Sequence, residues 1–74
     1  MNDRLRKVME MRYKSEIEDA KYKIELFNTQ ELLIPEHPDI TGEIDKLLDV
    51  IASAEDKLAV MSLHYDKNMA KEVL

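Results

Sequence analysis

The distribution of apolar and polar residues along the chain predicts two long helices. Apolar residues recur at intervals of three and four from about Asp3 to Leu33 and again from about Thr41 to Val73, without the strict alternation of β-strands. The segment IPEHPDITG lies between them and holds both prolines and the only glycine. Because proline does not continue a helix, the first helix should end near Leu33 and residues 34–40 should form a loop.

These elements predict an all-α fold, an antiparallel two-helix hairpin that forms a single domain over residues 1–74. Asp39 or Thr41 is suited to cap the second helix, because its side-chain oxygen can accept a hydrogen bond from a backbone N–H. A chain of this size buries only about 60% of the surface that it exposes when unfolded. There is no cysteine to form a disulfide, so association with another protein is the expected source of further stability.

One apolar stripe of each helix should form the seam between the two helices, since successive residues turn by about 100°. On the first helix this seam consists of Leu5, Met9, Tyr13, Ile17, Ala20, Ile24, Phe27 and Ile34. On the second helix it consists of Ile44, Leu47, Ile51, Ala54, Leu58, Met61, Tyr65 and Met69.

Both helices carry more apolar residues than this seam needs. A second set lies nearly opposite the seam of the first helix: Val8, Met11, Tyr22, Leu26 and Leu33. On the second helix, Leu48, Ala52, Ala59 and Leu63, with Ala70 and Val73, widen the apolar arc to roughly 220°, against roughly 100° for an ordinary surface helix. Such surplus predicts contact with another protein. The set on the first helix is our primary candidate surface, and the flank of the second helix, Leu48, Ala52, Ala59 and Leu63, is the alternative.

The charge of the chain argues against several classes of partner. The net charge is −5, and all of it comes from residues 35–74. An acidic chain repels nucleic-acid phosphates, and the one basic cluster (Arg4, Arg6, Lys7, Arg12 and Lys14) has no aromatic platform beside it. No apolar run approaches the roughly 18 residues of a membrane span, and the charged N-terminus does not resemble a signal peptide. We therefore expect neither nucleic acid nor a membrane span.

No group of residues points to catalysis. Glu16, Glu18 and Asp19 are acidic neighbours of the kind that bind Mg²⁺, but nearby lysines make a solvated helix face the simpler interpretation. His64 has no second histidine at metal-ligand spacing, and the chain has no thiolate. A nucleophile–base pair and a glycine-rich phosphate loop are both missing from the sequence. We expect no enzymatic activity, no metal site and no cofactor.

The tripeptide His37-Pro38-Asp39 also occurs in the loop of J-domain co-chaperones. There a basic helix leads directly into the motif, whereas here Glu31, Pro35 and Glu36 precede it. We therefore interpret the tripeptide as an ordinary turn, in which proline restricts the backbone and Asp39 caps or turns the chain.

The second helix resembles that of a known family. Leu47-Leu48-Asp49-Val50-Ile51, followed by Ala54-Glu55-Asp56, Leu58, Val60-Met61 and Tyr65, resembles the second helix of the small type III secretion needle-subunit co-chaperones of the YscE/PscE/SsaE/EscE type, especially the SsaE-like members. The motif covers residues 47–65, while the remainder matches in length and layout. The resemblance implies a non-enzymatic hairpin of the bacterial cytoplasm, without a cofactor. It would bind a larger TPR-like helical-repeat chaperone, and together they would keep the needle subunit from polymerising before export.

Two other functions fit the same residues. A homodimer in the form of a four-helix bundle would also cover the wide apolar arc of the second helix. A small acidic inhibitor would instead occupy a basic site on its target through the acidic tip, which comprises Glu36, Asp39, Glu43, Asp45 and Asp49. Salt-sensitive binding to a basic protein would distinguish the inhibitor from the other two functions.

Overall fold

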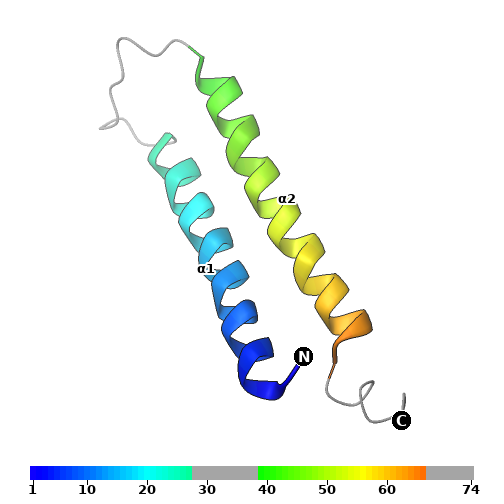
Figure 1. The fold of residues 1–74 in the computed structure, drawn as a ribbon. Helices are drawn as coiled ribbons and strands as arrows, with labels where there is room; N and C mark the ends of the chain where they lie inside the picture. Colours follow the sequence, from blue (N-terminus) through cyan, green and yellow to red (C-terminus); the bar gives the residue numbers. More distant parts are fainter. Residues whose placement is uncertain (28–38, 67–74) are drawn as a thin grey trace.

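The computed structural model describes residues 1–27 and 39–66, and within them the chain forms two helices, α1 (Asp3–Phe27) and α2 (Ile40–His64). The helices pack side by side and run in opposite directions (Figure 1). Each has 25 residues and is therefore about 37 Å long. The described residues contain no strand. The predicted all-α hairpin is thus confirmed.

The bounds of α2 differ from the prediction slightly at its start and more at its end. α2 begins at Ile40, one residue before the predicted start, and ends at His64. Tyr65 is the C-cap and its backbone N–H still donates to the carbonyl of Met61 at 2.8 Å, but its φ and ψ of −129° and 18° are not helical. The prediction that the helix continues through Tyr65 toward Val73 is therefore wrong. Asp66 opposes the negative end of the helix dipole, which disfavours a further turn.

Several predicted features lie outside the described residues. These are the end of the first helix near Leu33, residues 34–38 of the loop, and residues 67–73 of the second helix.

Both helices begin with a side-chain cap. Asn2 Oδ1 accepts a hydrogen bond from the backbone N–H of Leu5 at 2.7 Å. Asp39 Oδ1 accepts one from the N–H of Gly42 at 3.0 Å, so Asp39, and not Thr41, caps α2. A Cβ atom at position 42 would lie 2.7 Å from Asp39 Cγ. The Asp39 carboxylate therefore occupies a space that is open only because residue 42 has no side chain.

The core between the helices is thin. Only Ala20 and Ala54, each 1% exposed, and Met61, 7% exposed, are buried among the described residues. Most of the predicted seam is half-buried: Met9, Tyr13, Ile17, Ile24 and Phe27 on α1, and Ile44, Leu47, Ile51 and Leu58 on α2. The seam is thus where the periodicity placed it, but it contains no large side chain that is fully buried.

The seam prediction is wrong at the end of the hairpin where α1 begins and α2 ends (Figure 1). Leu5 is 49% exposed and Tyr65 is 46% exposed. Leu5 belongs to the first turn of α1, and Tyr65 follows the last residue of α2. Within the described residues, neither has a further turn of its own helix beyond it to cover its outer side. The remaining seam residues of the prediction, Ile34 and Met69, lie outside the described part of the chain.

Candidate protein-binding surfaces

The primary candidate surface on α1 is largely solvent-exposed. The exposed fractions of Val8, Met11 and Tyr22 are 53%, 68% and 59%. Val8 and Met11 line a shallow hollow together with Asp3, Arg4 and Lys7. Tyr22 lies eleven positions beyond Met11, about 16 Å along the axis, with Ser15, Glu18 and Asp19 in the interval. The apolar residues of this surface therefore form two separate patches.

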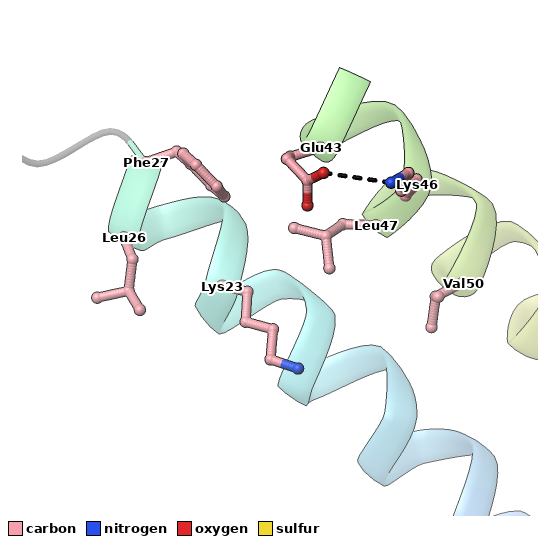
Figure 2. Close-up of a pocket in the computed structure, with 7 residues that line it drawn as sticks. All are labelled: Lys23, Leu26, Phe27, Glu43, Lys46, Leu47 and Val50. Atoms are coloured by element: carbon pink, nitrogen blue, oxygen red, sulfur yellow. Dashed lines mark hydrogen bonds and ion pairs between the residues drawn. The ribbon is translucent and has the colours of Figure 1, made fainter. Parts of the chain in front are cut away.

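Leu26, assigned to the same surface, has a different environment. It is half-buried and lines a groove of about 480 Å³ at the Phe27–Ile40 end of the hairpin, together with Lys23, Phe27, Glu43, Lys46, Leu47 and Val50. Figure 2 shows Phe27 and Leu47 pointing toward one another across this groove. The structure thus brings Leu26 together with two seam residues. Leu33, the last residue of the predicted set, lies outside the described residues.

Val50 and Val60 belong to neither predicted surface, yet they are 41% and 43% exposed. Val50 lies on the wall of the groove. The signal that could have identified it is its spacing, because Val50 is three positions after Leu47 and on the same side of α2. The motif LLDVI includes Val50 but does not indicate which side of the hairpin this residue faces.

The alternative surface on α2 follows one flank of the helix. Leu48 and Leu63 are 52% and 63% exposed, and Ala52 and Ala59 between them are also exposed. The intervals of four, seven and four residues keep all four side chains on one flank of the helix. From Leu48 to Leu63 the stripe is about 22 Å long. We call these four residues the α2 stripe.

The acidic residues of α1 are paired with basic ones along the same helix. Glu16 lies 3.5 Å from Arg12, Glu18 lies 3.4 Å from Lys21, and Asp19 lies 3.0 Å from Lys23. The three carboxylates that we weighed as magnesium ligands thus each face a cation. Across residues 1–27 and 39–66, no group of three or more His, Cys, Asp or Glu side chains is arranged to hold a metal ion.

The remaining candidate residues have local structural surroundings. Arg6, from the basic cluster, lies 3.1 Å from Glu10 and 3.8 Å from Asp3. The ring of His64 lies 6.5 Å from that of Tyr65 in an edge-on arrangement. Asp39 is the N-cap described above, while His37 and Pro38 are not among the described residues. Neither α1 nor α2 is apolar over a length that would cross a membrane.

The described residues therefore offer apolar surface in four places: the two patches of α1, the groove, and the α2 stripe. Apolar area of this kind, on a hairpin with so thin a core, is typical of proteins that bind other proteins. No known protein family, curated protein or solved structure matches this chain.

Proposed function

We propose that this protein is a non-enzymatic binding module, specifically a cytoplasmic co-chaperone of a bacterial type III secretion system. It would dock on a TPR-like helical-repeat chaperone and, through that partner, help to keep the needle subunit from polymerising prematurely. The likeness of residues 47–65 to the second helix of such co-chaperones supports the secretion role. The exposed apolar residues on both helices support the broader role of a binding module.

The observation that carries the proposal is the mismatch between core and surface. Among the described residues three are buried, two of them alanines, whereas large residues such as Met11, Tyr22, Leu48 and Leu63 are more than half exposed. Fully burying one large apolar side chain contributes about 1.5–3 kcal/mol. A partner that covers two or three of them would gain enough for micromolar binding or tighter.

The test is coexpression with the TPR-like chaperone and the needle subunit of the organism that encodes this chain. We expect a stable complex of the hairpin with the chaperone by size-exclusion chromatography with light scattering, and less needle-subunit polymer in sedimentation assays. Tyr22→Asp and Leu48→Asp place a charge on each candidate surface without touching the buried core. At least one of them should abolish the complex while helicity by circular dichroism is unchanged.

The homodimer is the principal alternative, and the same apparatus tests it. The co-chaperone proposal would be contradicted if the hairpin alone sediments as a stable dimer, unfolds cooperatively and binds neither of the coexpressed proteins. A hairpin that is monomeric, or that aggregates when alone and becomes soluble with the chaperone, would support it.

A further inference from the structure

The carboxylates of α2 gather beside the α2 stripe. Asp45 and Asp49 each stand three positions before a stripe residue, and Glu55 and Asp56 stand three and four positions after Ala52. Residues at these intervals are neighbours on a helix surface. All four carboxylates are exposed, and none forms an ion pair or side-chain hydrogen bond with another described residue. The stripe is therefore flanked by unneutralised negative charge.

The two lysines of α2 lie on the other flank of the helix. Lys46 lines the groove with α1 and lies 3.2 Å from Glu43, as Figure 2 shows. The Nζ atom of Lys57 lies 5.4 Å from the centre of the Tyr13 ring on α1. Neither cation forms an ion pair with the four carboxylates beside the stripe, although Lys46 stands three positions before Asp49. The two lysines of α2 thus contact Glu43 and the Tyr13 ring, and the four carboxylates remain unpaired.

The candidate surface on α1 has less such charge. Glu18 and Asp19 are each paired with a lysine of the same helix, while Glu25, three positions after Tyr22, forms no ion pair with another described residue. A basic partner would have to break the two pairs before it gained anything from Glu18 or Asp19. The α2 stripe requires no such exchange, and this difference favours it as the docking surface.

A second copy of this chain would fit the apolar residues of the stripe but not its charges. The spacing is symmetric, so an antiparallel pair of α2 helices would set Leu48 of one copy beside Leu63 of the other, and Ala52 beside Ala59. The same register would set Glu55 of each copy beside Asp56 of the other. Like charges opposed across an interface are costly, so the occupant should carry the opposite charge.

We propose that the α2 stripe docks a helix of the partner whose apolar seam is flanked by lysine or arginine. This inference rests on the proposed binding function, and it adds the chemistry of the partner and the choice of face. The contact helix should be at least about 15 residues long to follow the stripe. Because Ala52 and Ala59 are small, they allow a close approach of the two helix axes. Large apolar side chains of the partner should pack over them.

Two synthetic amphipathic peptides test the proposal. They share one leucine seam, and the positions beside this seam are lysine in one peptide and glutamate in the other. At low ionic strength we expect the lysine peptide to bind at least about tenfold more tightly, and added salt should narrow this difference. Equal affinities for the two peptides at low salt would overturn the proposal.

Matched variants separate a local effect from a general effect of net charge. The triple variant Asp45→Asn, Asp49→Asn, Asp56→Asn should bring the two peptides to nearly equal affinity. The control Glu16→Gln, Glu18→Gln, Asp19→Asn changes the net charge by the same amount on α1 and should preserve the difference. If both triple variants reduce the affinity difference between the two peptides equally, the attraction arises from the net charge of the chain and not from the carboxylates beside the stripe, and the proposal fails.

The location of binding provides the second readout. Leu48→Ser with Leu63→Ser should abolish binding of the lysine peptide, whereas Val8→Ser with Met11→Ser on α1 should not. Amide shifts on titration should concentrate around the α2 stripe. A peptide that maps to α1 would overturn this inference and leave the binding-module proposal intact. Binding at the stripe together with failure of the coexpression test would reject the secretion role and support this inference.

Discussion

The two helices have equal length but differ in how far their charged side chains are paired with one another. α1 carries seven basic and six acidic residues, and five ion pairs tie many of them together along the helix. α2 carries two lysines and five acidic residues, with one ion pair among its described side chains. Two of the three buried residues, Ala54 and Met61, belong to α2. Thus α1 pairs five of its six carboxylates along the helix, all but Glu25, whereas α2 leaves four of its five unpaired beside exposed apolar residues.

This difference separates what serves the fold from what serves binding. Pairs of exposed side chains three or four positions apart stabilise a helix only slightly, by about 0.2–0.5 kcal/mol each, but they need no other element. The four residues of the α2 stripe are exposed to water. If one side of α2 serves the fold and the other serves binding, substitutions on the side that faces α1 should change the free energy of unfolding. Substitutions in the α2 stripe should change only the affinity for a partner.

The largest effect on stability is expected at Met61. Met61→Ala removes the largest of the three buried side chains and should lower the free energy of unfolding by about 2 kcal/mol, at the low end for core methionine because the core is thin. The matched change Leu63→Ala, at a residue 63% exposed on the same helix, should cost well under about 0.5 kcal/mol. Urea unfolding followed by circular dichroism measures both. Equal losses would show that the two sides of α2 are not distinct.

The next effect concerns the two alanines at the middle of the seam. Lys57 lies against Tyr13 and Leu47 faces Phe27, and this register sets Ala20 and Ala54 at one level, where both are 1% exposed. Ala54→Leu should therefore force the helices apart and cost about 1–2 kcal/mol of unfolding free energy. Ala52→Leu on the stripe adds the same atoms facing solvent and should leave stability almost unchanged. An Ala54→Leu variant as stable as the parent would mean that the helices do not approach closely there.

The sequence predicted the seam well because a helix has one period, and residues such as Ala20, Ala54 and Met61 follow it without interruption. It failed at Leu5 and Tyr65 because periodicity assigns a residue to a side of a helix but does not say where the neighbouring helix stops. It failed at the end of α2 for a related reason. The apolar pattern continues beyond His64, but Asp66, at the negative end of the helix dipole, disfavours a further turn.

The binding surface was less predictable than the fold. The pattern identified two exposed apolar sets, and Tyr22 and Leu48 are indeed exposed to similar extents, 59% and 52%. What distinguishes the sets is the pairing of their neighbouring charges, which depends on side-chain positions such as that of Lys57 over Tyr13. The role of Leu26 in the groove depends on which residues of α2 lie opposite it. A one-dimensional pattern holds neither kind of information.

A smaller effect is expected at the cap that starts α2. Asp39→Ala should cost about 1 kcal/mol of unfolding free energy, since the N–H of Gly42 loses its acceptor. Gly42→Ala should fail to stabilise the parent, although alanine favours helices by about 1 kcal/mol over glycine, because the new Cβ displaces the Asp39 carboxylate. In the Asp39→Ala background the same change should stabilise. Thermal unfolding of the four proteins measures this coupling, and additive effects would contradict the cap geometry.

The smallest effect is also the most direct test of the comparison between the helices. Asp19→Asn removes a carboxylate that lies 3.0 Å from Lys23 and should cost about 0.3–0.5 kcal/mol at low salt. Asp49→Asn removes one with no ion pair, four positions after Asp45, and relief of this repulsion should leave stability equal or slightly higher. Replicate urea curves at low and high salt resolve the two signs. Opposite signs would mean that the charge of α2 is retained at a cost to the fold, as a binding role requires. A loss at Asp49 equal to that at Asp19 would mean that the carboxylates of α2 also serve the hairpin, and the distinction between the helices would disappear.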